Sequence, residues 1–311
     1  MARAVTFIIN PAAGFGKTRK KIKTLVKEIK AQDDKAPILL THHALHATAL
    51  AKQALLEGVE RIVVIGGDGT LNEVVNGYFD QEGKPHNPHA SLAIVPSGTG
   101  SDFARTLDHK HKLKEAIQKA VYGEPRMIDI GLVEACDVNG QMMKRYFINV
   151  SSLGLSGLVA GFMKNITRKL GSASAYFLST LQAIRVFRPP TILLGEEGGQ
   201  RTTLNNCALI SFANGRFFGS GMQIAPNALI DDGFLDVISI KDLSVLFFLT
   251  NGYKVYQGTH LELPNVTSIR QRECTVESLS KEPVYVETDG ELFAQLPAKF
   301  SIKPLALSFI C

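Results

Sequence analysis

Three glycines surround one aspartate at residues 66–70, Gly-Gly-Asp-Gly-Thr, directly after the apolar run Ile62–Ile65. Glycine reaches positive φ and lets a ligand approach the backbone with no Cβ in the way. The apolar run is typical of a buried parallel strand, and Thr70 with Glu73 forms a capping-box pattern that predicts a helix start. The first N–H groups of that helix would face an anion such as phosphate. Asp68 then stands where a carboxylate could hold a magnesium ion or its waters.

Two more polar loops follow strand-like runs. Residues 10–18 read Asn-Pro-Ala-Ala-Gly-Phe-Gly-Lys-Thr, and Pro11 occupies the position where the ATP pattern GxxxxGK[ST] needs glycine. A phosphate-lining turn with Lys17 as counter-charge and a plain strand-to-helix turn both stay open for this loop. Residues 96–105 carry two glycines, three hydroxyls and Asp102. Asp102 could serve a phosphate site, or it could cap the helix that follows.

Two acidic turns stand in the second half of the chain. Asp231-Asp232-Gly233 lies between strand-like runs without the EF-hand spacing. A hairpin turn is the simpler interpretation, and a hard cation held by one carboxylate and nearby carbonyls is the alternative. Asp289-Gly290-Glu291 is also a hairpin signal, and its Glu291 could act as a general base.

Two other features carry weaker signals. His42 and His46 have i, i+4 spacing, but no third ligand is evident, so a metal site is not favoured there. The segment 162–188 mixes apolar residues with lysines and arginines. A solvated helix pair and a membrane-facing, lipid-admitting surface both stay open for it.

Composition and charge narrow the class of protein. The 311 residues are 45% hydrophobic and 20% charged, with a net charge of +5, which suits a globular protein with an anionic ligand or membrane surface as partner. No feature points to nucleic acid. No apolar run approaches the roughly 20 residues that span a bilayer, and no secretory signal pattern is present, so we expect a cytoplasmic protein. Its four widely separated cysteines are expected to be reduced thiols.

The order of predicted elements indicates two domains. Strands and helices alternate up to residue 128, which predicts a doubly wound parallel sheet that binds ligands beyond the carboxyl ends of its strands. Strand-like runs then dominate, which predicts an antiparallel β-sandwich. We therefore expect an α/β plus β fold, with an α/β domain at 1–128 and a β-rich domain at 129–296. The last residues, 297–311, could return to the first domain. Within the second domain the patterns predict a strand at Arg145–Val150, helices at 158–167 and 174–187, and separate final strands at 300–302 and 307–310.

Taken together, the motifs resemble the diacylglycerol kinase catalytic domain family, and among its members the bacterial soluble lipid kinases. The resemblance rests on five motifs in order, at residues 10–14, 66–73, 96–104, 231–233 and 289–291. The 66–70 motif alone is shared with NAD kinases and is similar to the phosphofructokinase signature. Two departures stand out: Ser101 occupies a position where the family often has asparagine, and Phe15 one where it often has lysine.

The resemblance implies a site for ATP in an interdomain cleft and a role for each motif. Asp68, Asp102 and Asp129 would organise a catalytic Mg²⁺, and Glu291 would take the proton from the acceptor hydroxyl. A second, structural Mg²⁺ would be held by Asp232 and by the carbonyls of Leu229 and Phe234. The residues implied to line ATP are Asn10, Pro11, Ala12, Ala13, Gly14, Thr41, Gly67, Asp68, Gly69, Thr70, Leu71, Asn72, Glu73 and Thr99.

The function implied is transfer of the γ-phosphoryl group of ATP to a lipid hydroxyl such as that of diacylglycerol. Such a protein would meet its lipid through transient, peripheral contact with a membrane surface, and a homodimer stays open. The alternatives are a kinase for another hydroxyl (a sphingoid base, another glycerolipid or a soluble polyol) and a non-catalytic module that binds nucleotide or lipid.

Overall fold

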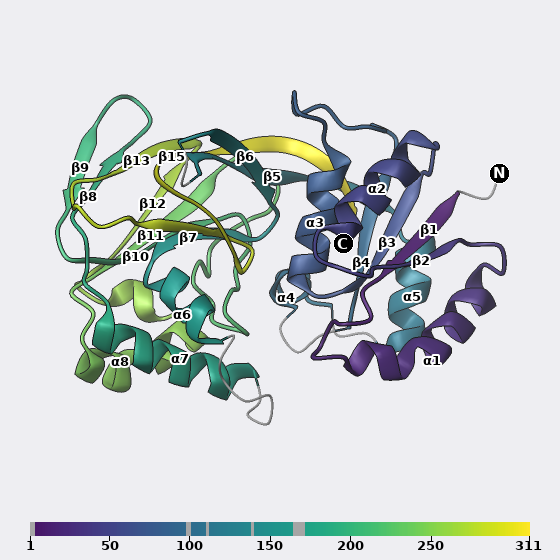
Figure 1. The fold of residues 1–311 in the computed structure, drawn as a ribbon, viewed down its shortest axis with the longest axis horizontal. Coiled ribbons are helices and arrows are strands. Elements are labelled where there is room, and N and C mark those ends of the chain that lie inside the picture. Colours follow the sequence, from purple (N-terminus) through teal and green to yellow (C-terminus); the bar gives the residue numbers. More distant parts are fainter. Residues whose placement is uncertain (1–3, 98–100, 110–111, 138–139, 164–171) are drawn as a thin grey trace. The chain divides into compact units, whose positions relative to one another are not determined.

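The computed structural model describes residues 4–97, 101–109, 112–137, 140–163 and 172–311. It divides into two compact units, one formed by residues 1–128 and 305–311 and the other by residues 129–304 (Figure 1). The predicted α/β plus β fold class is confirmed, and each unit is described separately below. No helix in the described ranges has the length and apolar character needed to cross a membrane.

The first unit is a parallel sheet with helices on both faces. Its strand order is β15-β4-β3-β1-β2, and only the C-terminal end of β15 takes part, with Phe309 paired to Leu92. Helices α1 and α5 cover one face and α2 and α3 the other (Figure 1). The elements are β1 (Val5–Ile9), α1 (Lys17–Gln32), β2 (Ile38–Leu40), α2 (His46–Leu56), β3 (Arg61–Gly66), α3 (Asp68–Tyr78), β4 (Ser91–Pro96), α4 (Asp102–Thr106) and α5 (Leu113–Tyr122).

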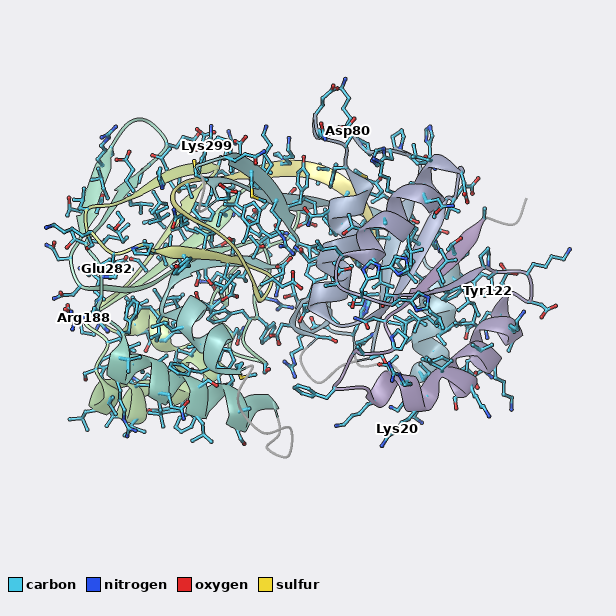
Figure 2. All side chains as sticks on the ribbon, viewed as in Figure 1. Lys20, Asp80, Tyr122, Arg188, Glu282 and Lys299 are labelled. Carbon is cyan, nitrogen blue, oxygen red and sulfur yellow. The ribbon has the colours of Figure 1, made fainter. Side chains whose placement is uncertain are left out.

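Apolar residues that alternate along the strands build the core of this unit. Phe7, Val63 and Val95 point to the face that Leu25 and Ile29 of α1 cover, and all five are buried. Residues i and i+4 of a helix lie on one face, so Leu25 and Ile29 reach the sheet together. The hydroxyl of Tyr122, labelled in Figure 2, donates to the Gln32 carbonyl at 2.7 Å and ties the end of α5 to the end of α1.

The second unit is an antiparallel β-sandwich with helices on one outer face. One layer has the order β12-β11-β10-β7-β14-β15; β13 and β5 pair with β15, β8 and β9 follow β13, and β6 pairs with β5. Phe212 and Phe300 stack in the core between the layers with ring centroids 3.7 Å apart. The elements are β5 (Pro125–Cys136), β6 (Met142–Phe147), β7 (Val150–Gly154), α6 (Leu155–Met163), α7 (Ser172–Val186), β8 (Ile192–Gly195), β9 (Arg201–Leu204), β10 (Cys207–Ala213), β11 (Leu235–Lys241), α8 (Val245–Asn251), α9 (Tyr253–Gln257), the 3-10 turn η1 (His260–Glu262), β12 (Val266–Gln271), β13 (Glu273–Ser278), β14 (Tyr285–Thr288) and β15 (Glu291–Ile310).

Four local features beyond residue 129 differ from the predictions. The strand expected at Arg145–Val150 is two strands, β6 and β7, and the two strands expected at 300–302 and 307–310 are parts of one long strand, β15. Helices α8 and α9 were not predicted at all. The helix expected at 158–167 begins earlier, at Leu155, and its residues 164–167 lie outside the described ranges.

Candidate functional site

The glycine turn after β3 starts its helix earlier than the sequence suggested. Helix α3 begins at Asp68, Gly67 is its N-cap, and no side chain caps it, so the predicted Thr70–Glu73 capping box is wrong. Tertiary partners take both side chains instead. Thr70 Oγ1 accepts a hydrogen bond from Asn10 Nδ2 at 2.9 Å, and Glu73 Oε2 accepts one from the Ala47 N–H at 3.0 Å. Glu73 therefore accepts a hydrogen bond from a free N–H group in the first turn of α2 and does not cap its own helix.

Two glycines of this turn serve different purposes. A Cβ on Gly66 would lie 2.7 Å from Thr70 Oγ1, so close packing alone requires glycine there. A Cβ on Gly67 would meet no described atom within 4 Å. The helix start at Gly67 therefore adjoins open space, where a phosphate could approach the backbone N–H groups.

Asp68 connects the second and third polar loops. Its carboxylate oxygens accept hydrogen bonds from the N–H groups of Asp102, at 2.8 Å, and Phe103, at 3.1 Å, which open α4. Asp102 does not cap its own helix, as one interpretation had it, because its buried carboxylate pairs with Arg105 Nη1 at 2.5 Å. The structure thus brings Asp68 and Asp102 together. Carboxylate oxygens are also the ligands that Mg²⁺ takes in proteins.

The other polar residues of this unit gather at the carboxyl ends of neighbouring strands. Asn10 follows β1 and Thr41 follows β2, and the Thr41 N–H donates to the Ile9 carbonyl at 2.9 Å. Asn10 Oδ1 also accepts from the Ala12 N–H at 2.9 Å, which shapes the first loop. Thr99 of the third loop lies outside the described residues.

Lys17 lies beside two of the three loops. It lines a hollow together with Gly14, Ser97 and Lys21. Thr18 closes one side, since its hydroxyl donates to the Ser97 carbonyl at 2.8 Å. Lys21 was missed by the sequence analysis, although its i, i+4 spacing from Lys17 is a readable signal that both side chains share one helix face.

In the second unit, the acidic turn at 231–233 is held by Asp129. The side chain of Asp129 is buried, its Oδ2 accepts from the Gly233 N–H at 2.6 Å, and its own N–H donates to the Ile230 carbonyl at 2.6 Å. Asp232 Oδ1 accepts from the Phe234 N–H at 3.0 Å, and its carboxylate forms an ion pair with Arg270. These contacts explain the conformation of the turn without a ligand.

The residues expected to hold a second, structural metal do not fit one as they stand. The Asp232 carboxylate is already neutralised by Arg270, whose guanidinium also lies 4.8 Å from the centroid of the Phe234 ring. A second guanidinium, that of Arg272, lies 4.9 Å from the same ring. Within the described ranges, no three His, Cys, Asp or Glu side chains cluster to hold a metal. A cation at Asp232 would have to displace the Arg270 guanidinium.

The turn that bears Glu291 is the two-residue hairpin that its sequence suggests. Asp289 and Gly290 have φ values of 47° and 90°, and Thr288 pairs with Glu291 across the turn, as a type I′ turn requires. The Asp289 carboxylate accepts the N–H groups of Ile148, Asn149 and Val150 at 3.0–3.1 Å. Those contacts bend the chain between β6 and β7, which is why the predicted single strand is divided.

Glu291 is oriented by an arginine. Its Oε2 accepts from Arg145 Nη2 at 2.6 Å, and its side chain is 42% exposed, whereas that of Arg145 is 15% exposed. A half-exposed carboxylate in a fixed orientation is accessible to a substrate hydroxyl. Asp289, by contrast, binds the backbone N–H groups between β6 and β7.

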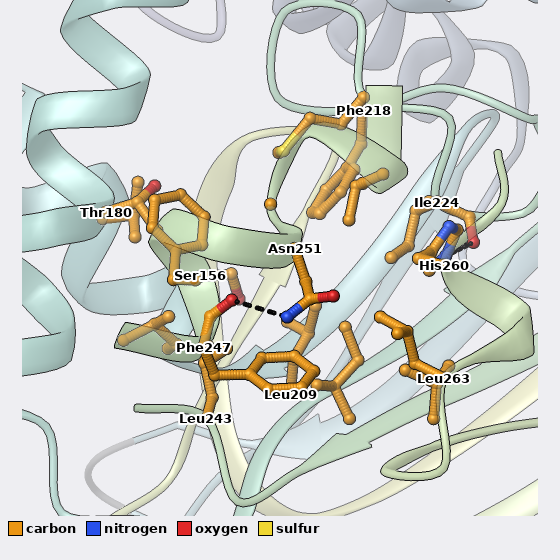
Figure 3. Close-up of a pocket in the computed structure, with 18 of the residues that line it drawn as sticks. Ser156, Thr180, Leu209, Phe218, Ile224, Leu243, Phe247, Asn251, His260 and Leu263 are labelled. Carbon is orange, nitrogen blue, oxygen red and sulfur yellow. Dashed lines mark hydrogen bonds between the residues drawn. The ribbon is translucent and has the colours of Figure 1, made fainter. Parts of the chain in front are cut away.

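The second unit also holds an apolar pocket that no sequence motif announced. It lies between the helices and the outer face of the sandwich (Figure 3). Its side chains with polar groups are few: Ser156, Tyr176, Thr180, Asn251 and His260. Burial lowers the pKa of His260, whose Nε2 lies 3.0 Å from the Ile224 carbonyl oxygen. The apolar residues that line it are Leu155, Val159, Leu209, Phe218, Met222, Ile224, Ile240, Leu243, Phe247, Phe248, Val255, Leu263 and Val266.

A row of polar residues crosses the sheet next to the floor of this pocket. Ser211, Ser152 and Glu287 pair side by side on β10, β7 and β14, two residues along from Leu209 on β10. Ser152 Oγ donates to Ser156 Oγ at 3.0 Å. Burial raises the pKa of Glu287 to about 7, against the opposing effect of the Gly290 N–H. Glu287 therefore lies between a pocket residue, Ser156, and the turn that carries Glu291.

Comparison with known proteins agrees with this arrangement. Residues 4–133 match the family model described as the diacylglycerol kinase catalytic domain, and residues 149–311 match the YegS C-terminal NAD kinase beta sandwich-like domain. The second match covers more than half of the chain. The chain belongs to the YegS-type diacylglycerol kinase family. The resemblance found in the five motifs is thereby confirmed.

Individual relatives cover nearly the whole chain. A protein named diacylglycerol kinase from Bacillus subtilis (strain 168) is 28% identical over 94% of this chain and 91% of its own length. A crystal structure of a diacylglycerol kinase from Bacillus anthracis str. Sterne has a TM-score of 0.71 at 23% identity, with 99% of this chain and 96% of that chain covered. Yeast NADH kinase complexed with NADH shares the fold at a TM-score of 0.51 and 11% identity, covering 99% of this chain and 83% of that chain. Family membership makes this chain a kinase, with ATP as co-substrate, and favours a lipid as the acceptor.

Proposed function

We propose that this chain transfers the γ-phosphoryl group of MgATP to the hydroxyl of diacylglycerol or a closely related lipid. The observation that carries the acceptor class is the lining of the pocket in the second unit, where apolar side chains outnumber polar ones. Pockets with such a lining bury apolar ligands, and their few polar groups fix the orientation. A soluble polyol would gain little from such a lining, because its hydroxyls would lose water without finding partners.

The first unit supplies the donor side of the reaction. The backbone N–H groups at the start of α3, next to the open space at Gly67, would bind phosphate oxygens. The carboxylate of Asp68, with Asp102 beside it, would hold the divalent cation and its waters, and Asp129 is the third carboxylate proposed to organise them. Asn10–Gly14, Thr41, Gly67–Glu73 and Thr99 are the proposed lining for ATP. The bound Mg²⁺ would neutralise phosphate charge, as in other phosphoryl transfers.

The second unit supplies the acceptor side. Glu291, oriented by Arg145, would take the proton of the acceptor hydroxyl as its oxygen forms a bond to the γ-phosphorus. The bond between that phosphorus and the β–γ bridging oxygen breaks, and ADP leaves with the electron pair. The acyl chains would occupy the apolar pocket, with Ser156 and Glu287 near the end that lies toward the Glu291 turn.

A labelling experiment tests the proposal. The purified chain is incubated with γ-labelled ATP, MgCl₂ and separate mixed micelles of diacylglycerol, monoacylglycerol, a sphingoid base or phosphatidylglycerol, with glycerol as a soluble control. Labelled phosphatidic acid, identified by mass spectrometry, is the expected product. Label in another lipid would identify that lipid as the acceptor, and label in glycerol would contradict the assignment of the pocket to the acceptor. If no label were transferred at all, the chain would be a non-catalytic module that binds nucleotide or lipid.

A further inference from the structure

Helices α8 and α9 are apolar on two opposite sides. The backbone stays helical through Gly252, with φ −59° and ψ −27°, so residues 245–257 form one nearly continuous helical segment, which we call the α8–α9 segment. Its inner side, with Phe247, Phe248 and Val255, lines the apolar pocket. A helix that is apolar all round is normally buried on all sides.

The outer side of the α8–α9 segment is nevertheless exposed. Leu246, Leu249, Tyr253 and Tyr256 are 72%, 54%, 56% and 39% exposed, and their spacing of three to four residues puts them in one stripe. The neighbouring helix α7 adds another exposed aromatic residue, Phe177, which is 37% exposed and whose ring centroid lies 5.4 Å from that of Phe248 on the inner side of the segment. Single exposed apolar residues are ordinary, but a contiguous stripe marks an interaction surface.

Charge selects the kind of partner. Residues 243–261 contain no aspartate or glutamate and one lysine, Lys254, and residues 138–195 contain no acidic residue either. At the end of α7, Arg185 and Arg188 are exposed, and Arg188 is labelled in Figure 2. An apolar stripe with tyrosines, on a segment whose single charged side chain is Lys254, is complementary to the interface of an anionic bilayer.

We propose that the α8–α9 segment docks this protein on anionic membranes by inserting the stripe Leu246–Leu249–Tyr253–Tyr256 into the lipid interface. The inference rests on the proposed function in one respect: a lipid acceptor must leave a bilayer to enter the pocket. The α8–α9 segment separates the pocket on its inner side from the stripe on its outer side. Docking through the stripe therefore brings the pocket wall against the membrane that holds the substrate.

Vesicle binding tests the docking surface with a charge-matched control. Leu246→Glu/Leu249→Glu changes the stripe, and Leu56→Glu/Leu279→Glu adds the same charges at leucines that are 63% and 58% exposed elsewhere. Each protein is sedimented with vesicles of equal parts phosphatidylcholine and phosphatidylglycerol. Wild type and control should bind alike, and the stripe variant should bind at least about tenfold more weakly. Equal binding of the two variants, or no binding by wild type, would overturn the proposal.

A tryptophan reporter keeps the test independent of folding defects. The chain contains no tryptophan. Leu249→Trp therefore introduces a single tryptophan on the stripe, and Leu279→Trp is its control. Emission of Leu249→Trp should shift to the blue when these vesicles are added, and that of Leu279→Trp should not. An unchanged spectrum for Leu249→Trp would contradict insertion. A dimer that Leu246→Glu/Leu249→Glu dissociates in the absence of vesicles would assign the stripe to self-association instead.

Activity separates this inference from the proposed function. Phosphorylation of dihexanoylglycerol, which dissolves without vesicles, should proceed in Leu246→Glu/Leu249→Glu within about twofold of wild type, because neither side chain lines the pocket. Loss of this activity in the stripe variant alone would place the stripe in the catalytic machinery and overturn a pure docking role. Absence of the activity in every protein would contradict the lipid kinase proposal and leave the vesicle result unaffected.

Discussion

The two candidate half-sites of this protein are built in different ways. In the first unit, the groups proposed to bind phosphate are mostly backbone N–H groups, shaped by glycines within single loops such as 66–70. In the second unit, the pocket is made of side chains from α6, α7, α8, α9 and the strands β10 to β12. A site made of backbone can be recognised in a short motif, because one loop suffices to form it. A site made of packed side chains has no such local pattern.

Glu291 gives the largest test of this contrast, since it would act on the acceptor and leave the donor side untouched. Glu291→Gln should lower turnover by about 10² to 10⁴ while ATP binding, measured by calorimetry, stays unchanged. Exposed Glu277 provides the matched control, and Glu277→Gln should behave as wild type. A simultaneous loss of ATP affinity would show that Glu291 belongs to the donor side and not to the base position.

Asp68 tests the donor side in the same manner. Asp68→Asn should reduce turnover by about 10² to 10³, the range for loss of one electrostatic contact to the transition state, and should raise the Mg²⁺ concentration needed. Because Asp68 also accepts two N–H groups of α4, thermal unfolding should show a smaller loss of stability, about 0.5–2 kcal/mol. Asp34→Asn, at an exposed carboxylate, is the control. Near-normal turnover with a normal Mg²⁺ requirement would remove Asp68 from the mechanism.

Filling the apolar pocket tests whether the acyl chains bind there. Val255→Trp adds bulk to the pocket wall, so activity on long-chain diacylglycerol should fall by about 10- to 200-fold, with a rise in KM, while ATP binding is kept. Leu279→Trp places the same ring on an exposed surface of the unit and should have no effect. Unchanged chain-length preference in Val255→Trp would mean that the acyl chains bind elsewhere.

The smallest expected effect concerns stability alone. Burial raises the pKa of Glu287 from 4.5 to about 7, with Asp289 adding to the shift, so the folded protein binds more protons there than the unfolded chain does between these pH values. Stability should therefore fall as pH rises from about 4.5 to 7, by up to about 3 kcal/mol. Urea unfolding at pH 5 and pH 8 should show a smaller loss for Glu287→Gln than for wild type. Parallel losses in both proteins would assign the pH dependence to other groups.

Several features of the fold could be predicted because they are locally encoded. The alternation of strands and helices up to residue 128 required only period and composition, and the Asp289-Gly290 hairpin required only two residues that tolerate positive φ. The exact helix start at Asp68 could not be predicted, because Thr70 and Glu73 had partners at Asn10 and Ala47, far away in sequence. The break between β6 and β7 depends in the same way on Asp289, about 140 residues downstream.

The sequence by itself determined the class of fold, the family and the glycine turns that point to phosphate. All of these rest on neighbours within a few positions of one another, where backbone geometry follows residue type. Only the tertiary structure decided that Asp68 supports α4, that Arg270 occupies the Asp232 carboxylate, and that the α8–α9 segment covers an apolar pocket. Those outcomes depend on which distant side chains meet once the chain is packed, and no local pattern specifies that pairing.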